Sequence, residues 1–178
     1  MPRLLRPAEV RHHDTVAIAR SLLGRILVAR DAAGRRLARR ITEVEAYNGP
    51  DDRACHASRG RTKRTAVMFE PGGVWYVYLV YGMHEMLNLV TGPRDYPAAV
   101  LIRGVEAIDG PGRVTRVLGV NRRFNAQPCA RATGLWIEDD GFVPPAAEVQ
   151  ATPRIGIDYA GTPWIEKPWR FVWQRTEA

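Results

Sequence analysis

Two carboxylates and a tyrosine share one extended stretch of this 178-residue chain, directly before a turn. A period of two places four of these side chains on one face, namely Ile41, Glu43, Glu45 and Tyr47. The simplest interpretation is a solvent-facing row, with three smaller side chains turned inward (Thr42, Val44 and Ala46). The alternative is catalytic. Glu45 leads into a Gly-Pro turn and a basic loop, where a carboxylate could act as a general base for water.

One arginine interrupts an otherwise apolar predicted strand. Arg103 follows Val100-Leu101-Ile102, and burying an unpaired guanidinium is costly. We therefore expect Arg103 to meet a carboxylate, with Glu45 and Glu106 as candidates. Two interpretations stay open: a structural salt bridge in the core, or an arginine that keeps Glu45 ionised and orders a water molecule.

The loop after the turn contains a histidine beside a cysteine. His56 follows Cys55, but His12, His13 and His84 are scattered, and no second ligand pair occurs at metal-binding spacing. We therefore expect no metal site. His56 is either a surface loop residue or a ring that stacks on, or hydrogen-bonds to, a group entering the loop.

Basic residues follow in the same loop, interleaved with serine and threonine: Arg59, Arg61, Lys63 and Arg64. Such a segment can contact phosphates, although basic loops are commonly just solvated. Residues 1–64 hold fifteen Lys or Arg against seven Asp or Glu, a net of +8, whereas residues 65–178 carry a net of −1. This asymmetry predicts one electropositive face, which suits a phosphate backbone.

An aromatic and β-branched run ends at a glycine turn over residues 74–83. Its composition predicts a strand, with Trp75 and Tyr76 in the core. Tyr81 differs because Gly82 follows it, which places the ring at a turn where burial is difficult. An exposed ring at a hairpin tip is costly without a partner, and a stacked nucleobase is one such partner.

Many strands and few helices are predicted to position these residues. One helix is expected at 14–23, with Asp14 as N-cap and Gly24 as stop, and a short one around 114–118. Strands are expected at 25–30, 35–47, 74–81, 85–91, 98–105, 135–138, 154–157 and 170–174, with an irregular functional loop at 53–70. Because helices and strands do not alternate regularly, these elements indicate an α+β fold.

Length and composition fit one globular domain spanning residues 1–178, with 46% hydrophobic and 25% charged residues. Two cysteines make no disulfide scaffold. We expect no secretory signal, because no apolar segment follows Arg3 and Arg6. The longest uncharged run, residues 71–84, is too short to cross a bilayer. We expect a cytoplasmic, nucleoid-associated protein with no membrane partner.

Taken together, these segments resemble the alkyladenine (3-methyladenine) DNA glycosylase family, from about residue 22 to residue 173. The matching stretches are Glu43–Asp52, Ala54–His56, Arg59–Arg61, Met68-Phe69, Pro71-Gly72, Tyr76–Tyr78, Tyr81–Met83, Asn88, Val100–Arg103, Gly110–Gly112 and Arg154–Ile157. The resemblance implies a curved, mainly antiparallel sheet with a few surrounding helices and a protruding β-hairpin. The connection 104–109 is shorter than is usual in the family, so we expect the loss of some DNA contacts or of a supporting helix.

The resemblance also implies a catalytic group and a DNA-inserting hairpin. Glu45 would activate the attacking water, and Arg103 and the carbonyl oxygen of Ile155 would help to position it. Tyr81 would enter the minor groove and fill the gap left by an extruded nucleotide. Met83 would lie on the same hairpin.

A base pocket is implied in the same way. Tyr47 would stack on one side of the flipped base, with His56 and Tyr78 on the other side. Ala54 would belong to the pocket wall. Asn88 would crowd the exocyclic amine of normal guanine and so exclude it.

The implied activity is a monofunctional DNA glycosylase that needs no cofactor. A bifunctional lyase would need an amine nucleophile, and neither Lys63 nor Lys167 has a pocket-like context. The expected partner of a monomeric enzyme is double-stranded DNA carrying alkylated or deaminated purines, such as 3-methyladenine, 7-methylguanine, hypoxanthine or ethenoadenine. The alternative is a DNA-binding protein of the same fold without catalysis.

Overall fold

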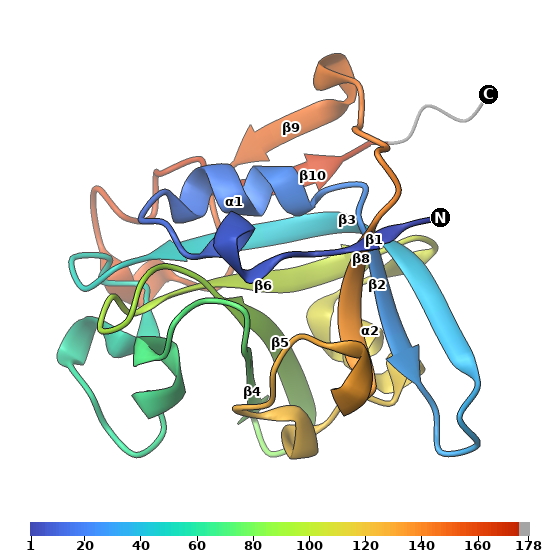
Figure 1. Cartoon of the computed structure of the whole chain (residues 1–178). Coiled ribbons are helices and arrows are strands. Elements are labelled where there is room, and N and C mark those ends of the chain that lie inside the picture. Colours follow the sequence, from blue (N-terminus) through green and yellow to red (C-terminus); the bar gives the residue numbers. More distant parts are fainter. Residues whose placement is uncertain (175–178) are drawn as a thin grey trace.

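The computed structural model describes residues 1–174, whose strands form one connected antiparallel sheet (Figure 1). The main strand order is β1-β8-β2-β3-β6-β5-β4, while β7 pairs with β6, and β10 pairs with β3 and β9. The strands are β1 (Arg3–Leu4), β2 (Ile26–Arg30), β3 (Arg36–Asn48), β4 (Trp75–Val80), β5 (His84–Val90), β6 (Ala98–Val105), β7 (Ile108–Asp109), β8 (Leu135–Asp139), β9 (Val149–Thr152) and β10 (Arg170–Trp173). The α+β class and the mainly antiparallel sheet are confirmed.

Two α-helices pack on this sheet within residues 1–174, α1 (Thr15–Leu22) and α2 (Pro111–Leu118). As predicted, Asp14 caps α1, because its carboxylate accepts a hydrogen bond from the Ala17 amide at 2.9 Å. Helix α1 packs on β3 and β6, and α2 packs on β5 and β6. No helix in this range is long and apolar enough to span a bilayer.

Strand β3 organises the sheet because its two halves have different partners. Residues 36–40 pair with β2, whereas residues 41–48 pair with β6, and residues 43–45 also pair with β10 on the other edge. In Figure 1, β2 and β8 run across the direction of β3 and β6, so the sheet is strongly curled. The second half of β3 therefore lies between two strands in the interior.

A β-bulge in β3 overturns the predicted alternation of faces. The register against β6 shifts on both sides of Glu43, and an irregularity of this kind changes which face the following side chains take. Ile41 consequently packs in the main core with Val44 and Ala46. The opposite face is covered as well, since Glu45 is fully buried and Glu43 is only 8% exposed. The interpretation of this row as solvent-facing is wrong.

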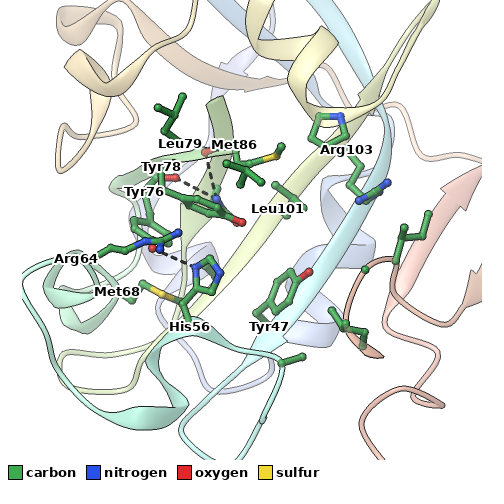
Figure 2. Close-up of a pocket in the computed structure, with 18 of the residues that line it drawn as sticks. Tyr47, His56, Arg64, Met68, Tyr76, Tyr78, Leu79, Met86, Leu101 and Arg103 are labelled. Carbon is green, nitrogen blue, oxygen red and sulfur yellow. Dashed lines mark hydrogen bonds between the residues drawn. The ribbon is translucent and has the colours of Figure 1, made fainter. Parts of the chain in front are cut away.

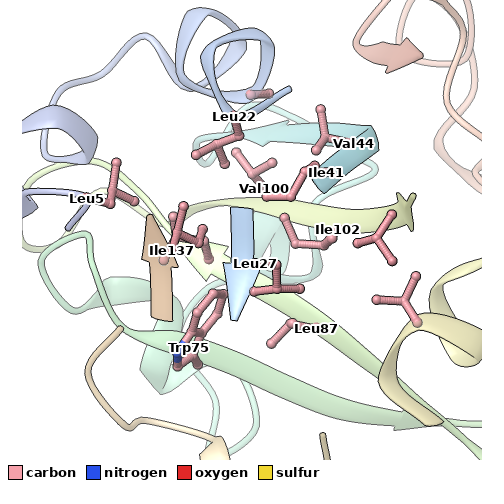
Figure 3. Close-up of a cluster of buried hydrophobic side chains, with 14 of the residues drawn as sticks. Leu5, Leu22, Leu27, Ile41, Val44, Trp75, Leu87, Val100, Ile102 and Ile137 are labelled. Carbon is pink, nitrogen blue, oxygen red and sulfur yellow. The ribbon is translucent and has the colours of Figure 1, made fainter. Parts of the chain in front are cut away.

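The main hydrophobic core lies between α1, α2 and the curled sheet (Figure 3). Leu22 of α1 belongs to the same cluster as side chains from several strands, including Leu27 and Ile102. Trp75 is completely buried there, and its indole N–H donates to the Leu135 carbonyl oxygen at 3.0 Å. The expectation that Trp75 and Tyr76 are buried is confirmed, although Tyr76 belongs to a second cluster.

The expectation of a strand at residues 154–157 is wrong. These residues form no strand, because Arg154 turns into the protein and Gly156 adopts a φ of +73°. The C-terminal strand pair is β9 with β10 instead. The segment 53–70 is a loop without α-helix or strand, as expected, and it contains the short 3-10 helices η2 (His56–Arg59) and η3 (Ala66–Phe69).

We expect Leu27→Ala to lower the free energy of unfolding by about 3 kcal/mol, because the truncation leaves a cavity in the core. Leu27 is fully buried, whereas Leu4 on β1 is 39% exposed, so Leu4→Ala serves as the control and should cost less than about 1 kcal/mol. Denaturant unfolding of both variants measures this difference. Equal losses in the two variants would contradict the placement of the core.

Candidate active site

A cavity of about 420 Å³ opens beside the second half of β3 (Figure 2), a volume typical of small-molecule sites. The five residues that the family resemblance assigns to a base pocket all line it: Tyr47, Ala54, His56, Tyr78 and Asn88. Arg103, Ile155 and the tip residue Tyr81 line it too. Residues from β3, β4, β5, β6 and two loops therefore meet around one cavity.

Aromatic rings form one side of the cavity. The His56 and Tyr78 ring centroids lie 4.6 Å apart, and Tyr76 and Tyr78 lie 5.1 Å apart. His56 Nδ1 and the Tyr76 hydroxyl are 3.2 Å apart, within hydrogen-bond distance. Figure 2 shows these rings together and Tyr47 apart from them. Tyr76 received no site role from the sequence, because a buried strand tyrosine is usually a core residue.

The environment of His56 favours a neutral ring. The pKa of His56 lies below its ordinary value. Burial is the larger cause, and the positive charge of the nearby Arg64 guanidinium is the smaller one. The ring nevertheless keeps an exposed side that faces the cavity. A neutral imidazole at this wall can stack on a flat ligand without adding positive charge.

The carboxylate of Glu45 lies directly behind the cavity wall. Its Oε1 accepts a hydrogen bond from the Ile155 amide at 2.8 Å, and its Oε2 accepts one from the Tyr47 hydroxyl at 2.8 Å. The Nε of Arg103 is 3.6 Å from Oε1. Ile155 thus meets Glu45 through its amide, whereas the family resemblance assigned a role to its carbonyl oxygen.

Burial raises the pKa of Glu45, while the charge of Arg103 and the hydrogen bonds from Ile155 and Tyr47 oppose that increase. A carboxylate with a raised pKa binds a proton more strongly, which makes the ionised form a better general base. The pKa of the Tyr47 phenol is raised by burial and by the negative charge of Glu45. Tyr47 therefore stays protonated and keeps donating its hydrogen bond.

Arg103 forms an ion pair with Glu45, as predicted, but its shorter contact is with Glu43, a carboxylate that was not among the two candidates. Its Nε donates to Glu43 Oε1 at 2.9 Å, and its contact with Glu45 is longer. Glu106 directly follows β6, and its backbone amide donates to the Arg40 carbonyl oxygen at 2.7 Å. Glu43 and Glu45 share a face of β3, as their spacing of two residues predicts, and the same guanidinium reaches both carboxylates.

A buried ion pair fixes the two loops that flank Glu45. Arg154 donates to both carboxylate oxygens of Asp52, at 2.6 and 2.9 Å, and both side chains are completely buried. Asp52 also accepts hydrogen bonds from the amides of Asn48 and Ala54. Sequence reasoning assigned no role to either partner, although both lie in the stretches that resemble the family.

The hairpin tip projects as predicted. Tyr81 is 89% exposed and Met83 is 69% exposed. Tyr81 and Gly82 both have positive φ, and the Met83 amide donates to the Val80 carbonyl oxygen at 3.1 Å, which defines a type I′ turn. An exposed aromatic ring leaves apolar surface in water, and a positive φ strains the backbone of a residue other than glycine. Residues that combine both costs motivate a functional hypothesis.

The basic loop divides into wall and surface residues. Arg64 lines the cavity, and its guanidinium lies 5.1 Å from the centroid of the Tyr78 ring. Arg61 stacks on Phe69 and pairs with Asp95 at 3.3 Å. The remaining two, Arg59 and Lys63, are exposed. Contact of this loop with phosphates stays a prediction.

Within residues 1–174, no three His, Cys, Asp or Glu side chains are grouped so that they could hold a metal ion. The chain's two lysines lie outside the cavity wall: Lys63 is exposed, and Lys167 packs against Trp164 and Trp169. The titratable groups of the cavity wall are therefore guanidinium, phenol and imidazole, with the Glu45 carboxylate directly behind the wall.

Asp52→Asn should lower the free energy of unfolding by about 3 kcal/mol or more, because it leaves the Arg154 guanidinium buried without its carboxylate. Arg35→Ala removes an ion pair in which the arginine is 79% exposed, so this control should cost less than about 1 kcal/mol. Thermal and denaturant unfolding measure both variants. A small, equal effect would show that the buried pair does not hold the loops.

Comparison with known proteins connects this geometry to a family. A family model described as Methylpurine-DNA glycosylase (MPG) matches residues 9–177. A relative from Anaeromyxobacter sp. (strain Fw109-5) is 46% identical over 166 residues, covering 89% of this chain and 84% of the relative. One from Myxococcus xanthus (strain DK1622) is 45% identical over 169 residues, with coverages of 90% and 84%. Both are named "Putative 3-methyladenine DNA glycosylase".

Proposed function

Because this chain belongs to the methylpurine-DNA glycosylase family, we propose that it excises alkylated or deaminated purines from duplex DNA with a water activated by Glu45. As a member of that family it is a DNA glycosylase, an enzyme of DNA repair. The finer proposal covers the substrates named above, the attacking water and an intact abasic site as product. It also includes a monomeric enzyme that acts at the nucleoid.

The position of Glu45 is the observation that carries this proposal. Its carboxylate lies behind an aromatic cavity and is held by the Ile155 amide and the Tyr47 hydroxyl. Hydrolysis of an N-glycosidic bond needs a base that takes a proton from water as the water attacks the sugar. Arg103, whose Nε is 3.6 Å from Glu45, favours the ionised form that this step requires.

The cavity wall suits an electron-poor purine. Tyr47, His56 and Tyr78 offer aromatic faces to a flat base, and a cationic alkylated base gains additional attraction from such faces. Such a base is already a good leaving group, so the enzyme needs no strong acid. Asn88 is buried on the wall with its amide nitrogen donating to the Tyr76 carbonyl oxygen at 3.2 Å, which gives the wall a fixed polar edge for selecting bases.

The exposed hairpin supports extrusion of a nucleotide from a duplex. Extruding a base costs a few kcal/mol in lost stacking and pairing. Tyr81 is available to occupy the vacated space, and the basic loop can contact the backbone around it. Neither lysine of the chain lies on the cavity wall, so hydrolysis without a covalent amine intermediate is the favoured course.

Glu45→Gln should reduce base release by roughly 100- to 10,000-fold, because the amide cannot accept the proton of water. Single-turnover excision is measured on duplex oligonucleotides that each carry one defined lesion, with duplex affinity determined in parallel. Glu70→Gln, at an exposed ion pair with Arg94, is the matched control and should excise normally. Normal excision by Glu45→Gln would overturn the proposed mechanism, and normal affinity would separate catalysis from binding.

Tyr81→Ala should slow excision from duplex DNA by roughly tenfold, the effect of losing one stacking contact of 1–3 kcal/mol. Excision from a single strand carrying the same lesion should change less, since no gap has to be filled there. Val143→Ala, at another exposed apolar residue (79%) that lies outside the cavity, is the control. A similar loss on single and double strands would exclude the role of Tyr81 as a wedge.

A further inference from the structure

Two carboxylates and two guanidiniums form a compact cluster beside the cavity. Glu43 Oε1 accepts from Arg103 Nε at 2.9 Å and from Arg170 Nε at 2.6 Å. Glu45 lies two residues along β3, with its Oε1 3.6 Å from Arg103 Nε. All four side chains are largely buried, with exposures of 10% for Glu43, 0% for Glu45, 14% for Arg103 and 23% for Arg170.

The backbone arrangement makes this cluster possible. Strand β3 lies between β6, which carries Arg103, and β10, which carries Arg170. The bulge places Glu43 opposite Gly104 of β6, where a Cβ would lie 2.9 Å from the Glu43 Cβ and 3.4 Å from its Oε2. Any larger residue at position 104 would therefore displace the Glu43 side chain.

The two glutamates have different hydrogen-bond partners. Glu43 takes the Nε of both arginines, whereas Glu45 takes the Ile155 amide and the Tyr47 hydroxyl. Within residues 1–174, no hydrogen bond from a terminal nitrogen of Arg103 to a protein acceptor is found, and the Arg103 side chain lines the cavity. Those terminal nitrogens are therefore available to whatever occupies the cavity.

We propose that Glu43 is a positioning residue, which holds Arg103 by its Nε so that the guanidinium faces the cavity and does not close onto Glu45. This inference rests on the proposed function of Glu45 and assigns a distinct residue to its support. Without the negative charge of Glu43, Glu45 is the nearest carboxylate to Arg103. The existing 3.6 Å ion pair between Arg103 and Glu45 would then shorten to a direct hydrogen bond. That would withdraw the guanidinium from the cavity and engage the carboxylate that must accept a proton.

The charges around Glu45 make this division measurable. The negative charge of Glu43 acts to raise the pKa of Glu45, and Arg103 acts to lower it. Arg170 is the register partner of Glu45 on β10, while Tyr47, Tyr78 and Tyr159 are the titratable phenols that interact with Glu45. Loss of the Glu43 charge and closer approach of Arg103 both lower the pKa of Glu45.

Glu43→Gln tests the proposal with little change of shape. We expect single-turnover excision at pH 7 to fall about tenfold as Arg103 is misplaced. The acid side of the pH–rate profile, where Glu45 becomes protonated and the rate declines, should move to lower pH by about half a unit or more. Carbon-13 NMR titration of the Glu45 carboxyl should show the same direction of shift, independently of activity.

Glu138→Gln is the matched control, because Glu138 is also buried and accepts from two arginines, Arg36 at 2.7 Å and Arg131 at 3.1 Å, but lies on β8 away from the cavity. The Glu138→Gln protein should lose about as much stability as the Glu43→Gln protein. The pH–rate profile of Glu138→Gln should stay unchanged. An unchanged profile and Glu45 titration in Glu43→Gln would overturn the positioning role. Excision that is unaffected by Glu45→Gln would instead overturn the proposed function, so the two failures are distinguishable.

Discussion

The enclosed carboxylate of Glu45 is the constraint on which the site depends. Removing a carboxylate from water costs several kcal/mol, and it is tolerated only where hydrogen bonds and opposite charge replace the lost hydration. Here the replacements come from three places: Tyr47 on the same strand, Arg103 on β6 and the amide of Ile155 on a distant loop. Because two of these partners are far away in sequence, the site can form only when the whole sheet and its loops are assembled.

A second buried carboxylate, that of Asp52, links the surrounding loops to the same site. The Asp52 carboxylate accepts hydrogen bonds from the backbone amides of Asn48, at the end of β3, and of Ala54. It also accepts one from the guanidinium of Arg154. Since Arg154 immediately precedes Ile155, the same ion pair that anchors the loop after β3 also places the Ile155 amide beside Glu45. Burial of this ion pair makes the arrangement rigid, because breaking it would leave an uncompensated charge in the interior.

Local sequence signals predicted the parts of this protein that local physics controls. The Asp14 cap, the aromatic strand and the exposed Tyr81 follow from capping, composition and a glycine turn, and the structure has all three. The bulge at Glu43 could not be predicted, because it arises from pairing with β6 and not from the spacing within β3. That one irregularity changed the face of Ile41, which packs with Val44 and Ala46. The gathering of Glu45, Tyr47 and Arg103 was anticipated mainly through the family resemblance.

A continuous strand couples the cavity to the projecting tip. Tyr76 and Tyr78 of β4 line the cavity, and Tyr81 follows after three more residues, which span about 10 Å in an extended strand. Pairing of β4 with β5 along its whole length keeps this segment straight. Under the proposed function, a ring inserted into a duplex at the tip would stand at a fixed distance from the aromatic wall proposed to bind the base. Extrusion and capture would then need no separate adjustment, since one hydrogen-bonded strand sets the spacing between the two places.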